Sequence, residues 1–145
     1  MLNVESIESG TVIDHIKGGK GKRVLELLKI GDGFESRVAL VMNVPSKKLG
    51  KKDIVKIEGF SVSEAQANLI ALIAPNSTIN IIKNKEVSNK FTVSPPKELR
   101  GVGVCGNPNC ITNVEYAEKL FKGESEDAYR CAYCERMFKP EELVR

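Results

Sequence analysis

The sequence predicts an α+β protein with two unequal parts, and three observations lead to this class. Apolar residues before residue 94 follow β-like and helical periods in the order β-α-β-β-α-β. Two successive prolines, Pro95 and Pro96, then force an extended connection, because proline donates no backbone hydrogen bond. All four cysteines of the 145-residue chain follow that connection. We therefore expect two domains, residues 1–96 and 97–145.

The first two elements are read from a change of period. Residues 11–16, TVIDHI, form a β-branched run that is typical of a strand, and the glycines of GGKG at 18–21 break it. Residues 22–30 then place their apolar side chains on one helical face. We expect a strand followed by a helix that extends to Ile30.

The later elements complete the order. Strands are expected at residues 37–44 and 53–57, with turn-forming residues at 45–50 between them. Ser63 is expected to cap a second helix, which Ala74 and Pro75 end. The last strands are expected at 78–82 and from 86 to 93. This order is that of the ferredoxin-like sandwich, an antiparallel sheet with two helices on one face.

Composition excludes several classes of protein. With 41% apolar and 28% charged residues, the chain is typical of folded globular proteins. It has no apolar run near the roughly 18 residues that cross a bilayer, and MLNVESIESG lacks the layout of a signal peptide. We therefore expect no membrane partner and a cytoplasmic location, where thiols stay reduced.

The four cysteines carry the most specific pattern in the chain. Cys105 and Cys110 are separated by four residues, Cys131 and Cys134 by two, and each pair lies among turn-forming residues. Two turns that each present two thiolates make a closed tetrahedral site, which is typical of structural zinc. An iron–sulfur centre or a catalytic dithiol fits the spacing less well. We expect residues 97–145 to form a small zinc-bound β-rich domain, because so short a segment needs such a staple.

Charge is shared unevenly between the two parts. Residues 1–96 contain 14 Lys and Arg against 10 Asp and Glu, whereas residues 97–145 contain 8 against 9. The first part is therefore the better candidate for binding an anion. The second part has no electrostatic reason to bind nucleic acid, and its charge favours a protein partner.

Polar residues interrupt two of the predicted strands. Residues 52, 54 and 56 project from one face of a strand and Asp53, Val55 and Ile57 from the other, so Lys52 and Lys56 share a face, about 13 Å apart along the strand. In a regular strand Asp14 and His15 point to opposite faces, so one ligand meets both only at the end or edge of the strand. A solvated lysine face and a structural histidine are the alternatives. The chain shows no nucleophile–base pair and no glycine-rich phosphate loop, so an enzyme is poorly supported.

The motifs TVIDHI, GKKDIVKIE, LIAPNSTINII, CGNPNC and CAYC, in this order, resemble the regulatory chain of aspartate carbamoyltransferase from Val4 to about Leu143. The resemblance implies a non-catalytic allosteric subunit in de novo pyrimidine biosynthesis. It implies that the N-terminal domain binds CTP or ATP, and that the zinc domain docks on the catalytic chain. It further implies regulatory dimers that join catalytic trimers in a dodecamer.

The resemblance also implies roles for individual residues. Asp14 is expected at the ribose, His15 and Lys90 at the phosphates, and Lys52 at the triphosphate. Lys56 is expected at the ribose and base, Asn80 near the phosphates and Val87 beside the sugar. Ser6 and Ile7 are expected to offer backbone groups to the base. Cys105, Cys110, Cys131 and Cys134 are expected to hold one Zn²⁺ ion.

Two other classes of function remain open from the residues alone. A ferredoxin-like sheet with a zinc ribbon is also a scaffold for RNA binding, but the strands at 53–57 and 78–82 contain no aromatic residue to stack on bases. An enzyme in its own right would require turnover by the isolated chain. The expected partners are therefore proteins and nucleotides, and not a nucleic acid.

Overall fold

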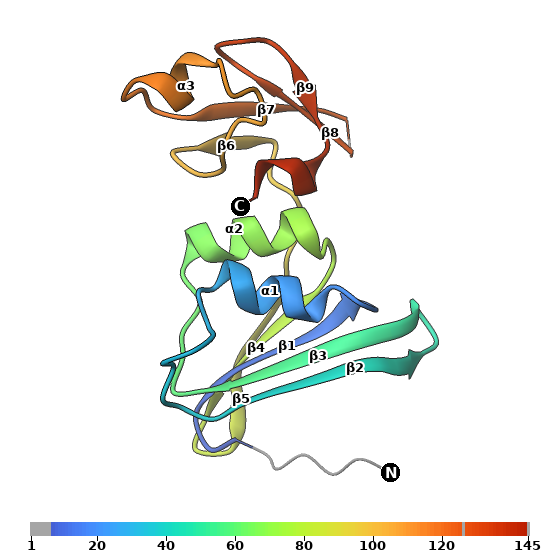
Figure 1. Ribbon diagram of the computed structural model, residues 1–145. Helices are drawn as coiled ribbons and strands as arrows, with labels where there is room; N and C mark the ends of the chain where they lie inside the picture. Colours follow the sequence, from blue (N-terminus) through green and yellow to red (C-terminus); the bar gives the residue numbers. More distant parts are fainter. Residues whose placement is uncertain (1–6, 126, 145) are drawn as a thin grey trace.

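The computed structural model describes residues 7–125 and 127–144, which form two antiparallel sheets and a few short helices (Figure 1). The first half contains β1 (Gly10–Lys17), α1 (Gly21–Leu27), β2 (Val38–Ser46), β3 (Gly50–Glu58), α2 (Glu64–Ile73), β4 (Thr78–Lys83) and β5 (Glu86–Thr92). The second half contains β6 (Glu98–Arg100), α3 (Ile111–Val114), β7 (Leu120–Ser125), β8 (Ala128–Cys131), β9 (Met137–Phe138) and the 3-10 helix η1 (Pro140–Leu143).

The large sheet has the strand order β2-β3-β1-β4-β5, and all its neighbours pair antiparallel. Its first four strands have the order expected of a ferredoxin-like sandwich, and β5 adds one further strand at the edge. Figure 1 shows α1 and α2 on one face of this sheet. The predicted α+β class is confirmed.

The two helices differ in how well the sequence predicted them. Ser63 caps α2 as expected, since its hydroxyl accepts a hydrogen bond from the Gln66 N–H while the Gln66 side chain accepts one from the Ser63 N–H. The prediction that the first helix reaches Ile30 is wrong, because α1 ends at Leu27. The backbone becomes left-handed at Lys29, with a φ of 62°, and this ends the helical path.

The core of the first half lies between the sheet and its two helices. Asp53, Val55 and Ile57 of β3 are fully buried on the helix side, while Lys52 and Lys56 are only half-buried, which confirms the predicted alternation. Among the residues described, no helix covers the opposite face of this sheet, called here the open face. Any ligand of the sheet therefore has access from that side.

Asp53 is a buried acid on the helix side of the sheet. It accepts backbone hydrogen bonds from Gly19 and Gly21 at 2.9 and 2.8 Å and from Asn43 at 2.9 Å. These bonds satisfy the carboxylate without a cation and attach the β1–α1 turn and β2 to β3. Asp53 thus has a structural role.

The second half is built on a smaller sheet with the order β6-β7-β8-β9. Its largest fully buried side chains are those of Leu99, Phe121, Tyr129 and Leu143. The Tyr129 hydroxyl donates a hydrogen bond to the Pro96 carbonyl, so the connection between the halves is held at its end.

No helix in the described part of the chain combines the length and the apolar character that crossing a bilayer requires.

Candidate functional site

A β-bulge in β1 determines where Asp14 and His15 lie. Ile13 pairs with Val55 and Ile16 pairs with Asp53, so two residues of β1 stand opposite the single residue Ile54. His15 adopts the left-handed conformation, with a φ of 58°. Ile13 and Ile16 are fully buried toward the helices, and the two residues between them therefore both leave the helix side. A regular strand would have separated Asp14 from His15, and the bulge brings them together.

The contacts of these two residues place them on the open face. The Lys52 ammonium lies 3.0 Å from Asp14 Oδ1, and their side chains are 18% and 26% exposed. His15 Nδ1 lies 3.3 Å from the hydroxyl of Thr78, the residue that pairs with Asp14 across the sheet. The result is a polar group of two potential cations and one carboxylate, which we call the polar end.

A second group of predicted residues crosses four neighbouring strands. Val12 pairs with Lys56 on one side and with Asn80 on the other, and Asn80 pairs with Lys90. Because paired residues share a face, these four side chains lie in one row on the open face. Asn80 is further held by a hydrogen bond of 3.4 Å from its amide to the Val12 carbonyl.

A small pocket opens beside this row. Its volume is about 230 Å³, and its walls are formed by Ile7, Val12, Lys56, Asn80, Ile82, Lys85 and Val87. Four of these residues, Ile7, Lys56, Asn80 and Val87, are among those expected at the nucleotide. Asp14, His15 and Lys52 lie farther along the sheet at the polar end, and Ser6 lies outside the described residues.

Sequence reasoning missed three residues of this pocket: Val12, Ile82 and Lys85. Val12 and Ile82 pair directly with predicted residues, Lys56 and Val87, so their face follows from the register alone. Lys85 follows Asn84 in a turn in which both residues have positive φ. No pattern in the sequence indicates that this turn lies beside the pocket.

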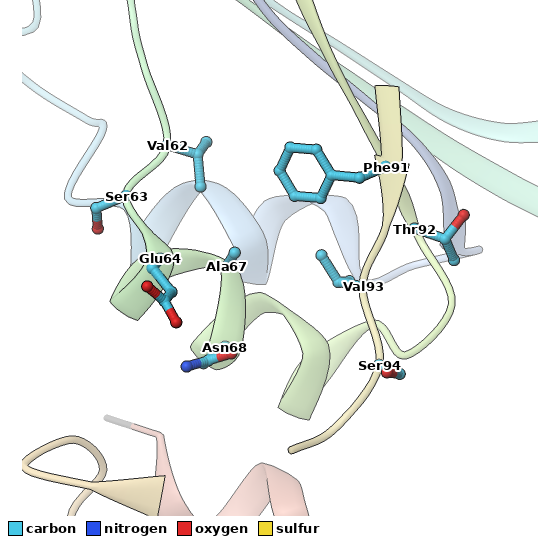
Figure 2. Close-up of a pocket in the computed structure, with 9 residues that line it drawn as sticks. All are labelled: Val62, Ser63, Glu64, Ala67, Asn68, Phe91, Thr92, Val93 and Ser94. Atoms are coloured by element: carbon cyan, nitrogen blue, oxygen red, sulfur yellow. The ribbon is translucent and has the colours of Figure 1, made fainter. Parts of the chain in front are cut away.

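Two larger cavities contain none of the predicted residues. One has a volume of about 410 Å³. Figure 2 shows its wall residues Phe91 and Val93 facing Val62, which precedes α2, and Ala67 of α2. Its wall residue Ser63 is already used in the helix cap. A cavity of about 670 Å³ lies where the two halves join and includes Pro96 and Tyr129. Neither cavity brings together groups with evident chemistry.

The four cysteines form one cluster in the second half. Their sulfur atoms all lie within 4.8 Å of one another, and the Cys105–Cys134 and Cys110–Cys131 sulfur pairs are each 3.7 Å apart. A disulfide needs about 2.05 Å, so these are free thiols. Tetrahedral Zn–S bonds of about 2.3 Å place sulfurs about 3.8 Å apart, so the cluster fits zinc.

The surroundings of the thiols influence their protonation. Burial raises the pKa of Cys105 to about 12 and also raises the pKa of Cys131. Burial acts on Cys110 in the same direction, but hydrogen bonds from the Thr112 hydroxyl, 3.2 Å from the sulfur, and from the Thr112 backbone lower the pKa of Cys110 to about 7. Thr112 thus supports one thiolate, and a cation bound among the sulfurs would favour all of them.

Comparison with known families accounts for both halves. The family model described as "Aspartate carbamoyltransferase regulatory chain, allosteric domain" matches residues 2–94, and that of the metal binding domain of the same chain matches residues 97–144. These two matches leave few residues of the chain uncovered.

Individual relatives agree with the family models. The chain is 52% identical to the aspartate carbamoyltransferase regulatory chain of Pyrococcus abyssi over 146 residues, which cover 99% of this chain and 96% of the relative. The corresponding figures for Pyrococcus horikoshii are 51% over 148 residues, 99% and 96%. For Methanococcus vannielii they are 50% over 137 residues, 93% and 91%.

Such relatives are named as regulatory chains, a family of non-catalytic subunits, and this confirms the expectation that the chain is not itself an enzyme. The protein belongs to the family of aspartate carbamoyltransferase regulatory chains and contains the allosteric and metal-binding domains of that family.

Proposed function

We propose that the chain binds CTP or ATP on the open face of the large sheet and so regulates the catalytic chain of aspartate carbamoyltransferase. The observation that carries this proposal is the pocket with Lys56, Asn80 and Val87, which adjoins the polar end formed by Asp14, His15 and Lys52. An apolar-walled pocket suits a base and sugar. Cations farther along the same face suit phosphates.

The charges support this arrangement. A nucleoside triphosphate carries about four negative charges. Four lysines lie on or beside the open face: Lys52, Lys56, Lys85 and Lys90. The Asp14 carboxylate is in contact with Lys52. His15 and Lys90 are proposed at the phosphates with Asn80 near them, and Lys52 at the triphosphate. Lys56 is proposed at the ribose and base, Asp14 at the ribose, Val87 beside the sugar, and the backbones of Ile7 and Ser6 at the base.

The second half is proposed to hold one Zn²⁺ ion through Cys105, Cys110, Cys131 and Cys134. Four thiolates close the tetrahedron, so the ion would be structural and leave no position for a substrate. Near these cysteines Ile111, Val114 and Tyr116 are exposed by 48%, 68% and 103%. Such exposed apolar side chains support docking of this domain, residues 97–145, on the catalytic chain.

Regulation requires that the effector distinguish two states of the assembly. We propose a cytoplasmic dodecamer in which regulatory dimers join catalytic trimers, with residues 1–96 as the effector domain. A nucleotide that binds one quaternary state more tightly shifts the assembly toward that state, and the shift cannot exceed the difference in affinity.

The test is calorimetric titration of the zinc-loaded chain with CTP, repeated on Lys90→Ala. Loss of a hydrogen bond to a charged group weakens binding by more than about 1.5 kcal/mol. Lys22→Ala is the matched control, because Lys22 is an exposed lysine of α1 on the other side of the sheet. It should bind CTP as the native chain does.

Two results would contradict the proposal. Absence of saturable CTP binding to the native chain would remove the nucleotide role and leave only the docking role of the zinc domain. Equal weakening by Lys90→Ala and Lys22→Ala would show that binding follows net charge and not this site.

A further inference from the structure

Lys17 is a residue of the open face to which neither the motifs nor the pocket gives a role. It ends β1 and pairs with Lys52 of β3. The preceding pair, Ile16 and Asp53, is fully buried toward the helices. Because successive residues of a strand alternate, Lys17 and Lys52 both project on the open face, beside the polar end.

The Lys17–Lys52 pair is electrostatically unfavourable by itself. Side chains directly opposite each other in antiparallel strands have Cβ atoms about 4.5–5.5 Å apart, and like charges there repel. The Asp14 carboxylate, 3.0 Å from the Lys52 ammonium, offsets one of the two charges. Within the described ranges no acidic side chain lies at ion-pair distance from Lys17, which is exposed. The pair therefore has one uncompensated positive charge that an anion would neutralise.

The position of this pair along the sheet indicates which anion. Lys52 is four residues from Lys56 on β3, a separation of about 13 Å along the strand. Lys56 lines the pocket proposed for the base and sugar, so the lysine pair lies at the far end of an extended ligand. His15, in contact with Thr78, lies between the pair and the neighbouring strand β4.

We infer that Lys17 and Lys52 together bind the terminal phosphate of the effector, and that this pair makes the site prefer nucleoside triphosphates to monophosphates. The inference rests on the proposed nucleotide site and adds one residue and one selectivity to it. A terminal phosphate between two ammonium groups converts their repulsion into two charge-assisted hydrogen bonds. A monophosphate does not extend this far and gains nothing from Lys17.

The test measures affinities of the zinc-loaded chain for CTP and for CMP by calorimetry, in the native chain and in Lys17→Gln. The expected result is an about tenfold fall in the CTP-to-CMP affinity ratio, with the affinity for CMP unchanged. Lys17→Arg keeps the charge and should keep the ratio. Lys48→Gln is the matched control, because Lys48 is an exposed lysine of the β2–β3 turn and its substitution changes the net charge by the same amount. It should also leave the ratio unchanged.

A thermal melt of the nucleotide-free protein separates binding from folding. Lys17→Gln removes a like-charge pair, so its Tm should equal or exceed that of the native chain. A lower Tm would show that Lys17 stabilises the fold and would overturn the inference.

The remaining outcomes are also decisive. Suppose that the native chain binds CTP, but that Lys17→Gln keeps the native CTP-to-CMP affinity ratio or that Lys48→Gln lowers this ratio as much as Lys17→Gln does. The proposed function then survives and the role of Lys17 does not. If the native chain binds no CTP, the proposed function fails and the inference fails with it.

Discussion

The two halves of the chain are held together by different means. In the first half, isoleucines of the sheet such as Ile13, Ile57 and Ile79 are fully buried against α1 and α2. In the second half a smaller set of large side chains, including Phe121 and Tyr129, is buried beside four clustered thiols. Apolar burial can account for the first fold, whereas we expect the second fold to depend also on a metal ion held by its cysteines.

Two polar contacts link the halves beside the packing of α2 against η1. Lys20 lies 3.0 Å from Glu141, and the Arg23 guanidinium donates to the Val144 carbonyl at 2.9 Å. Figure 1 also shows η1 next to α2. Polar contacts of this kind are typical of interfaces between domains, so we expect the halves to respond separately to perturbation.

Removal of the metal should have the largest effect, and that effect should be confined to the second half. A structural zinc contributes about 10–16 kcal/mol of binding free energy in small domains, which exceeds the stability of a segment of this size. A chelator should therefore unfold residues 97–145 and leave the first half folded. Amide spectra recorded before and after chelation check this, with zinc re-addition as the control. Loss of amide dispersion in both halves together would contradict it.

The pH dependence of metal loss has a definite sign. The thiols of Cys105 and Cys131 have a raised pKa, so without metal they hold protons at neutral pH. Metal binding must displace these protons, and its stabilisation is therefore present at higher pH and lost as pH falls. Release of zinc to an indicator dye should rise steadily as the pH is lowered from neutrality.

A substitution that leaves a cavity in the core of the first half should destabilise that half and leave the cysteine site intact. Ile57 is fully buried, and Ile57→Ala should lower the free energy of unfolding of the first half by about 2–5 kcal/mol. The zinc content should remain unchanged. Denaturant unfolding with a zinc assay measures both quantities, and Ile54→Ala, at the neighbouring half-buried position on the open face, should cost less. Reduced zinc content in Ile57→Ala would show that the two cores are one cooperative unit.

Weakening of the contact between the halves should have the smallest effect. The side chains of Lys20 and Glu141 are 33% and 49% exposed, so solvent screens their attraction. Glu141→Gln should change the free energy of unfolding by less than about 0.5 kcal/mol. Thermal melts that monitor each half measure this change. A loss above about 1.5 kcal/mol would mean that the halves stabilise each other.

Local patterns account for much of what the sequence predicts correctly. Alternation in β3 separates buried Val55 and Ile57 from Lys52 and Lys56 because a strand has a period of two residues. Ser63 caps α2 through contacts with a residue three positions away. The spacing of the four cysteines indicates a site for one metal ion because each pair occupies one turn. Each of these features depends on residues that are near one another in the chain.

The features that the sequence does not predict depend on strand pairing. The bulge that brings Asp14 and His15 to one face exists because two residues of β1 stand opposite Ile54 of β3. The pairing of Lys17 with Lys52, and the three backbone bonds that satisfy Asp53, join segments distant in sequence. The order of residues determines which positions are apolar or charged and which cysteines are spaced to bind a metal. Only the register of the folded sheet decides which of them meet, because a shift of one residue exchanges the two faces of a strand.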